Sequence, residues 1–360
     1  MASWQSKLTS LFLRAAVKRK INPHANPADA RARVDRIAAR FSKNQDWIKV
    51  TPVSANGVPG EWVEVPEDAP QDLSALENMP GNLVQSDPEI SAAPDDNPGA
   101  GKVLLYLHGG GYIVCSPATH RLMVARICRE AGLKALLIDY RLAPEHPFPA
   151  AVEDAEAAYR WLLAAGHKPE DIVVAGDSAG GGLTMSLLLT LREQNMPMPA
   201  AAALLSPWTD LALTGWTMLT HARRDPMLRL DSASLAVRHY MQDTSPTHPI
   251  ASSIYADLKG LPPLYVQVGE NEILLDDSRR LVSRAQAHGV ESSLEIWPGM
   301  PHVFQAFPQV PESKRAIEGI GAFLKAQVNR SATAPASTSP STSPATSPAA
   351  AQEASVKAAE

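Results

Sequence analysis

The sequence predicts an α/β protein built on a mostly parallel central sheet with helices on both faces. Along residues 102–328, short apolar runs alternate with helical patterns, which is typical of strand–helix–strand units. Near the N-terminus, two strand-like runs at 48–53 and 61–65 flank an Asn-Gly pair, a dipeptide that favours a tight antiparallel hairpin. A third run ends in Gly-Asp-Ser-Ala-Gly at 176–180 and passes directly into a helical pattern, which indicates a strand, a sharp turn and a helix.

The remaining elements follow in order from their periodicity. After the hairpin, the sequence predicts buried strands at 102–107, 135–139, 172–175, 201–205, 263–268 and 293–297. Between and after them it predicts helices at 120–130, through Trp161 and Leu162, from 179 onward, at 278–288 and at 311–328. The segment 207–260 breaks this alternation, because large apolar residues are interleaved there with proline and charge. We expect it to form a helical excursion over the sheet.

Two segments have compositions that cannot build a core. Residues 66–101 are rich in Pro, Asp, Glu, Asn and Gly, and no Lys or Arg occurs between Lys49 and Lys102. We expect a flexible acidic insertion on the surface there. Residues 329–360 are mostly Ala, Ser, Thr and Pro with a repeated Thr-Ser-Pro, which predicts a disordered tail.

Composition excludes several classes of protein. At 360 residues with 45% hydrophobic content, the chain can bury a sizeable core. A net charge of −5 gives no argument for nucleic acid as a partner. Cys115 and Cys128 do not make a disulfide framework, and no run approaches the roughly 20 apolar residues that span a bilayer. We expect a cytoplasmic protein. The sequence does not determine its oligomeric state, and a homo-oligomer is possible.

The first residues are expected to form a basic amphipathic helix. Its apolar side chains fall on one helical face, and basic residues surround them: Trp4, Leu8, Leu11, Phe12 and Ala15 on the face, and Lys7, Arg14, Lys18, Arg19 and Lys20 around it. Such a helix can lie on a membrane. We expect instead that the apolar face packs against the protein's own surface. A second helix is expected around 30–41.

The serine at the sharp turn is the candidate nucleophile. Ser178 stands at the apex between strand and helix, with Gly176 and Gly180 two residues before and after it. A turn this sharp holds the serine in strained backbone geometry, and strand and helix approach so closely that a Cβ at the flanking positions would clash. Gly-x-Ser-x-Gly alone is weak evidence, but its position between a strand and a helix favours nucleophilic catalysis.

Acyl transfer by a serine needs a base to take its proton and an acid to orient that base. His302 lies on the loop after the last predicted strand, at the end of the sheet where open α/β sheets place their sites. The loop after the preceding strand supplies carboxylates, among them Glu272, Asp276 and Asp277. No cluster of histidines and carboxylates has metal-ligand spacing, so we expect neither a metal nor a cofactor.

A run of glycines follows the first long strand, at His108-Gly109-Gly110-Gly111. Consecutive glycines let backbone N–H groups point at a substrate oxygen without side chains in the way. A phosphate-binding glycine loop is the alternative, but the lysine and following serine or threonine of such a loop are missing here.

Taken together, these motifs resemble the hormone-sensitive-lipase-like carboxylesterases of the α/β-hydrolase fold. The resemblance covers most of residues 1–328. It rests on the glycine loop at 108–111, the run Tyr-Arg-Leu-Ala-Pro-Glu-His-Pro-Phe-Pro at 140–149, the serine turn at 176–180, and His302 in its loop. Ser-Pro-Trp-Thr-Asp-Leu at 206–211 and the run at 297–305 are similar to bacterial short-chain esterases and monoterpene ε-lactone hydrolases.

The resemblance implies an oxyanion hole made by the N–H groups of Gly110, Gly111 and Ala179. It also implies that residues 1–45 and 207–260 form a cap over an α/β-hydrolase domain at 46–328. The activity expected is hydrolysis of short- to medium-chain carboxylic esters or lactones, and the alternative is a non-catalytic ligand-binding protein on the same fold.

The acid departs from the family pattern. Many members carry Asp-Pro-Leu where this chain has Glu272-Ile273-Leu274. Glutamate can orient an imidazole as aspartate does, so Glu272 is the first candidate. Asp276 and Asp277 are the alternatives, although both are expected in the first turn of a helix, where carboxylates often interact only with the helix dipole.

Overall fold

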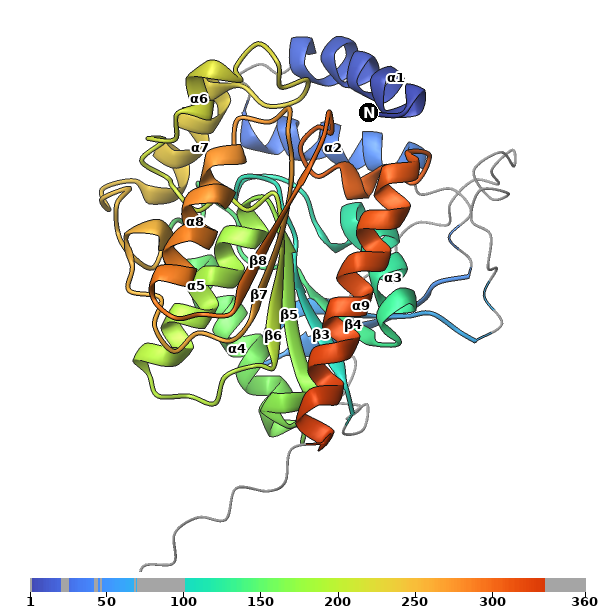
Figure 1. Cartoon of the computed structure of the whole chain (residues 1–360), viewed down its shortest axis with the longest axis vertical. Coiled ribbons are helices and arrows are strands. Elements are labelled where there is room, and N and C mark those ends of the chain that lie inside the picture. Colours follow the sequence, from blue (N-terminus) through green and yellow to red (C-terminus); the bar gives the residue numbers. More distant parts are fainter. Residues whose placement is uncertain are drawn as a thin grey trace, which may run out of the picture.

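One eight-stranded sheet runs through the molecule in the order β1-β2-β4-β3-β5-β6-β7-β8 (Figure 1). The computed structural model describes residues 2–20, 26–41, 45, 47–67, 69 and 101–333. From β3 to β8 all pairings are parallel, which confirms the predicted mostly parallel sheet. The strands are β1 (Lys49–Ala55), β2 (Val58–Glu64), β3 (Val103–Leu107), β4 (Lys134–Ile138), β5 (Ile172–Asp177), β6 (Ala201–Leu205), β7 (Leu264–Gly269) and β8 (Ser292–Trp297).

The antiparallel edge is the predicted N-terminal hairpin. β1 pairs with β2 through a two-residue turn in which Asn56 and Gly57 have φ angles of 51° and 85°. Positive φ at both turn positions is what a hairpin turn of this length requires, and Asn-Gly is the pair that adopts it most readily. β2 then pairs antiparallel with β4, which joins the hairpin to the parallel strands.

Helices cover both faces of the sheet (Figure 1). On one face α3 packs against α9, and on the other α4 packs against α5, with α8 beside β7 and β8. The apolar side chains of β3, β4 and β5 alternate between two buried clusters, one on each face, because successive residues of a strand point to opposite sides. The helices of these layers are α3 (Pro117–Ala131), α4 (Ala150–Ala164), α5 (Ala179–Glu193), α8 (Leu275–Ala287) and α9 (Pro311–Thr333).

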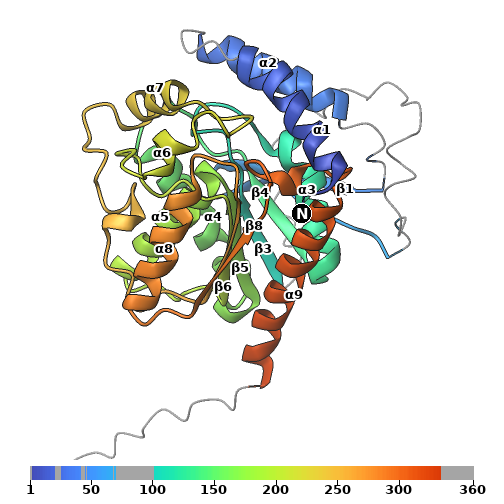
Figure 2. The same ribbon diagram turned by 45° about the horizontal axis from the view of Figure 1, so that its top comes forward.

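Four further helices stand together beyond the carboxyl ends of the parallel strands (Figures 1 and 2). They are α1 (Trp4–Phe12), continued by η1 (Leu13–Val17) and η2 (Lys18–Lys20), then α2 (Pro27–Phe41), α6 (Thr217–Thr220) and α7 (Leu230–Met241). The described residues also form short 3₁₀ turns: η4 (Pro169–Asp171), η5 (Ser253–Tyr255) and η6 (Phe304–Ala306). The expected excursion at 207–260 therefore consists of α6, α7 and the turn η5, joined by irregular segments.

The two segments of biased composition lie mostly outside the described residues. Of the expected insertion at 66–101, the structure describes only 66, 67, 69 and 101. Of the expected tail at 329–360, it describes 329–333, and these residues continue α9. The helix runs on because the residues Asn-Arg-Ser-Ala-Thr at 329–333 do not interrupt it, whereas the first proline comes at position 335.

The prediction for the apolar face of the first helix is wrong. α1 buries Ser6 and Thr9, and the large apolar side chains on its other face are exposed to solvent. Polar contacts fix this orientation: the backbone N–H and the hydroxyl of Ser3 both donate to the Glu312 carboxylate at 2.8 Å, and the Ser6 hydroxyl donates to Met300 Sδ at 3.5 Å. Amphipathicity distinguishes two faces of a helix, but it does not determine which one is buried when the polar face has such partners.

We predict that Gly180→Ala will destabilise the protein strongly, whereas Gly101→Ala will not. A Cβ at position 180 would lie 1.9 Å from the carbonyl oxygen of Leu107, so α5 would have to move away from β3. We expect a loss of about 3 kcal/mol, the upper end for overpacking in a core. A Cβ at position 101 meets no atom within 4 Å. Thermal unfolding of both variants measures this, and equal melting temperatures would contradict the proposed close packing.

Candidate active site

The candidate nucleophile lies at the turn between β5 and α5. Ser178 has φ 52° and ψ −120°, a backbone conformation that non-glycine residues rarely adopt. The turn is held on both sides: the N–H of Ser178 donates to Leu205 on the neighbouring strand at 2.8 Å, and its carbonyl accepts from Trp208. Gly176 and Gly180 allow this, because a Cβ at either position would lie within 2.7 Å of backbone atoms. The strained turn presents the hydroxyl at the carboxyl edge of the sheet.

Three loops bring a serine, a histidine and a carboxylate together. His302 Nε2 lies 2.9 Å from Ser178 Oγ, and His302 Nδ1 lies 2.6 Å from Glu272 Oε2. The imidazole and the carboxylate are almost completely buried. With Nδ1–H donating to the carboxylate, Nε2 is free to accept the serine proton, which is the arrangement that activates a hydroxyl nucleophile.

The two alternative carboxylates bind other groups. Asp276 accepts a hydrogen bond from the N–H of Thr217 at 3.1 Å, and Asp277 accepts from the N–H groups of Thr209 and Asp210 at 2.9 Å each. Both lie in the first turn of α8. Of the three carboxylates considered from the sequence, the one in contact with His302 is Glu272.

Ser206 fixes the other oxygen of Glu272. Its hydroxyl donates to Oε1 at 2.8 Å and accepts from the N–H of Val303 at 3.2 Å. The N–H of Gly269 donates to the same oxygen at 2.6 Å. Ser206 therefore links the loops that follow β6, β7 and β8, and the buried carboxylate has donors on both oxygens, as a buried charge requires.

A second buried carboxylate, Asp225, lies between α6 and α7. It accepts from the N–H groups of Met227 and Leu228 through one oxygen, and from the N–H of Ile273 through the other at 2.9 Å. Ile273 directly follows Glu272, so Asp225 ties the segment between the two helices to the loop of the candidate acid. Its negative charge also favours the protonated form of His302.

The electrostatics of His302 combine burial with these carboxylates. Burial, the largest single influence, disfavours the imidazolium, but the charge and hydrogen bond of Glu272 together with the charges of Asp225 and Asp177 outweigh it. The pKa of His302 is therefore raised above its ordinary value of 6.5. A histidine of this kind is a good proton acceptor that is stabilised once it becomes charged.

The glycine loop is attached to the nucleophile strand. The N–H of Gly109 donates to Asp177 Oδ1 at 3.0 Å, and the hydroxyl of Tyr106 donates to the same oxygen at 2.9 Å. A Cβ on Gly109 would lie 2.1 Å from the Asp177 carboxylate, which explains the glycine there. His120, on α3, lies 3.3 Å from the other carboxylate oxygen. The loop is thus held in register with the turn that carries the serine.

Backbone donors remain available beside the serine. Gly110 and Gly111 have φ angles of 117° and 65°, and their N–H groups are hydrogen-bonded to none of the residues that the structure describes. Ala179 is the first residue of α5, where N–H groups have no partner within the helix and the helix dipole is positive. These three N–H groups suit a developing negative charge on oxygen.

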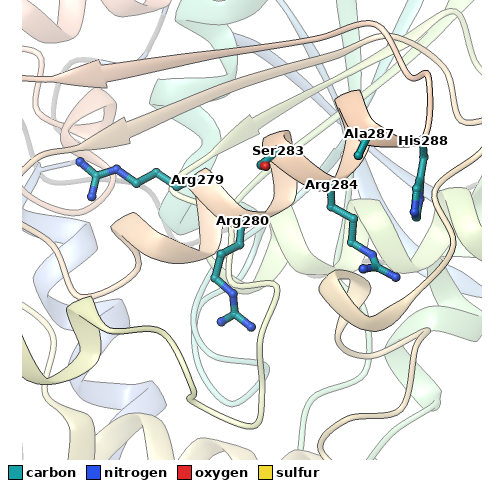
Figure 3. Close-up of a pocket in the computed structure, with 6 residues that line it drawn as sticks. All are labelled: Arg279, Arg280, Ser283, Arg284, Ala287 and His288. Atoms are coloured by element: carbon teal, nitrogen blue, oxygen red, sulfur yellow. The ribbon is translucent and has the colours of Figure 1, made fainter.

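A different surface feature, a basic hollow over α8, is shown in Figure 3. It is lined by Arg279, Arg280, Ser283, Arg284, Ala287 and His288. All three arginines are already engaged, Arg279 with Asp276 at 3.5 Å, Arg280 with Asp210 at 2.7 Å and Arg284 with the carbonyl of Ala256 at 2.8 Å. It contains none of the candidate catalytic residues. Within the described ranges, no group of three or more His, Cys, Asp or Glu side chains could hold a metal ion.

The structure brings together Ser178, Glu272 and His302, all three named from the sequence. Ala179 directly follows Ser178, and Gly109, next to Gly110 and Gly111, is bonded to Asp177. Sequence reasoning missed the supporting residues Ser206, Asp225, Asp177 and His120. Asp177 could have been suspected from its place beside the serine, and Ser206 from its position directly after a buried strand. The bond that ties Asp225 to the loop of Glu272 gives no local signal, since Ile273 is 48 residues away.

Comparison with known proteins gives consistent matches. A family model described as the α/β hydrolase fold matches residues 104–306. An acetyl-hydrolase of Streptomyces hygroscopicus is 46% identical over 226 residues, covering 62% of this chain and 76% of that protein. An esterase of Acinetobacter venetianus is 30% identical over 322 residues, covering 89% and 96%. The crystal structure of an esterase from the bacterial hormone-sensitive lipase family is 41% identical with a TM-score of 0.78, covering 91% of this chain and 99% of that one.

We predict that the pKa of His302 lies above 6.5 and falls in Asp225→Asn, because that substitution removes a negative charge that favours the imidazolium. NMR titration of the His302 ring measures both values. Asp276→Asn is the matched control, since its carboxylate binds Thr217 and should leave the titration unchanged. An unshifted midpoint in Asp225→Asn would contradict the electrostatic role of that residue.

Proposed function

We propose that this chain, which belongs to the bacterial hormone-sensitive-lipase-like esterases of the α/β-hydrolase fold family, hydrolyses carboxylic esters through an acyl-enzyme intermediate on Ser178. The observation that carries the proposal is the continuous hydrogen-bonded relay from Ser178 Oγ through His302 to Glu272. The names of the relatives, acetyl-hydrolase and esterase, support the same class of substrate.

In the first half-reaction Ser178 Oγ attacks the ester carbonyl carbon while His302 Nε2 takes the hydroxyl proton. The carbonyl oxygen becomes an oxyanion, and the N–H groups of Gly110, Gly111 and Ala179 donate to it. Each donor of this kind contributes typically about a hundred- to a thousand-fold in rate. The imidazolium then gives its proton to the leaving alkoxide, so the alcohol departs and an ester to Ser178 remains.

In the second half-reaction water replaces the alcohol. His302 takes a proton from the water, the hydroxide attacks the acyl carbon, and the returned proton restores the serine hydroxyl as the carboxylic acid leaves. Glu272 stabilises the imidazolium in both halves, and Ser206 and Gly269 hold its other oxygen in place through hydrogen bonds. A lactone would follow the same steps, with alcohol and acid remaining in one product.

We further propose that residues 1–45 and 207–260 act as a cap over the site, above a catalytic domain at 46–328. The helices α1, α2, α6 and α7 stand at the carboxyl edge of the sheet, where Ser178 and His302 lie (Figure 2). Tyr112, next to the glycine loop, stacks on Tyr240 of α7 at 3.8 Å, which supports a wall of the acyl site built from both parts. We infer a preference for short to medium acyl chains.

None of the described helices is long and apolar enough to cross a membrane. We propose the cytoplasm as the compartment, and the state of the cysteines supports it, since Cys115 and Cys128 are both unpaired thiols.

We predict that Glu272→Gln will reduce kcat on p-nitrophenyl butyrate by at least about a hundred-fold, because the amide favours the wrong imidazole tautomer and cannot stabilise the imidazolium. Asp276→Asn is the matched control and should retain kcat within about twofold. Asp276 lies four residues after Glu272, and its carboxylate binds Thr217. Circular dichroism establishes that both variants are folded.

Ser178→Ala sets the baseline of this assay, since only the nucleophilic oxygen is lost. Turnover by the unsubstituted chain that is no higher than that of Ser178→Ala would favour a ligand-binding protein on the same fold. A crippled Asp276→Asn beside an active Glu272→Gln would show that the acid lies one helical turn further along.

A further inference from the structure

The cap of this protein exposes an unusual amount of apolar surface. Seven large hydrophobic side chains are exposed among the described residues, and six of them lie on two cap helices. These six are between 51% and 71% exposed: Trp4, Leu8, Leu11 and Phe12 on α1, and Trp216 and Leu219 on or beside α6. Single exposed leucines are ordinary on a protein surface, but such a concentration on one part of the molecule marks an interaction site.

The orientation of this apolar face is fixed by the contacts on the other side of α1. Ser3 is bonded to Glu312 on α9, Ser6 to Met300 in the His302 loop, and Leu13 is buried. Turning the apolar side inward would break these bonds. The fold therefore keeps the apolar side of α1 exposed.

Two basic side chains join the helices into one unit. Arg14 donates to the carbonyls of Arg223 and Arg224 at 3.1 and 2.9 Å, and Lys18 donates to the carbonyls of Ala222 and Asp225 at 2.7 and 2.5 Å. The turn at 222–225 directly follows α6. Both apolar groups consequently stand at the same end of the molecule, beyond the carboxyl edge of the sheet (Figure 2). We refer to the six exposed side chains together as the cap apolar face.

The charge around this face differs from that of the rest of the chain. Residues 2–20 contain five Lys and Arg and no Asp or Glu, whereas the whole protein carries −5. Lys7, Arg14 and Arg19 are exposed there. Two copies meeting through this face would bring two strongly positive segments together, which is unfavourable, so the charge selects an anionic partner. Helices that bind in the plane of a membrane interface typically carry Trp, Phe and Leu on one face and Lys and Arg around it, as α1 does.

We propose that the cap apolar face docks on the surface of an anionic phospholipid bilayer. The Trp, Leu and Phe side chains enter the boundary between headgroups and acyl chains, and Lys7 and Arg19 bind lipid phosphates. Docking would turn the carboxyl edge of the sheet, with Ser178, toward the membrane. This goes beyond ester hydrolysis and does not depend on it, since binding to lipid can be measured with an inactive chain.

The test is co-sedimentation of the full-length Ser178→Ala chain, which hydrolyses no lipid, with vesicles of phosphatidylcholine alone or with roughly 30 mol % phosphatidylglycerol. We expect partitioning at least about tenfold stronger on the anionic vesicles, and loss of that preference in about 0.5 M NaCl, where charge is screened. Binding to neither vesicle would overturn the proposal.

Matched variants separate the face from the rest of the surface. Leu8→Ser with Phe12→Ser should weaken partitioning by at least about tenfold. Ile296→Ser, the exposed apolar side chain on β8 outside the face, should stay within about twofold. Lys7→Gln with Arg19→Gln should reduce binding to anionic vesicles by about fivefold per charge. Melting curves by circular dichroism establish that each variant is folded.

Equal binding by the Leu8 and Phe12 variant and the Ile296 variant would overturn the proposal, because lipid would then bind elsewhere. The other candidate partner is a second copy of this chain, and sedimentation velocity measures whether the protein forms dimers. A dimer that dissociates in the Leu8 and Phe12 variant, without vesicle binding by the parent chain, would show that the face is a contact between two copies.

Discussion

The contact between His302 and Glu272 is the interaction on which the rest of the site depends. A carboxylate and an imidazole, both buried, lie 2.6 Å apart. An isolated buried charge is costly, so this pair is stable only if the carboxylate has further donors and the imidazole a fixed tautomer. Ser206 and Gly269 supply the donors, and Asp225 holds the loop that follows. The reactivity of Ser178 is thus prepared by residues on four separate loops.

The carboxyl edge of the sheet also holds the nucleophile in a strained backbone conformation beside a buried carboxylate. Parallel strands end together there, and the turn after β5 forces Ser178 into a backbone conformation that only close packing can maintain. The glycine loop is tied to that turn through Asp177, so the donors and the nucleophile keep their relative positions. Preorganisation of this kind is effective because no group has to reorient when negative charge develops on the substrate.

Much of the fold and the core of the site could be predicted from the sequence, because local patterns carry them. Strand–helix alternation gave the parallel sheet, and the turn glycines marked the nucleophile. The acid stayed ambiguous because three carboxylates fall within six residues, and only the start of α8 separates Glu272 from Asp276 and Asp277. The bonds from Ser206 to Glu272 and from Ile273 to Asp225 could not be predicted, since they join residues 66 and 48 positions apart. The apolar face of α1 was assigned to the wrong side because its polar face has distant partners.

Covalent labelling tests the central claim, that this buried relay activates one particular serine. The protein is incubated with a fluorophosphonate ester, and the modified peptide is identified by mass spectrometry at a series of pH values. A nucleophile activated by His302 predicts one adduct per chain, on Ser178, with a labelling rate that falls as the imidazole becomes protonated on acidification. An adduct at another residue, or labelling of Ser178 that does not change with pH, would contradict it.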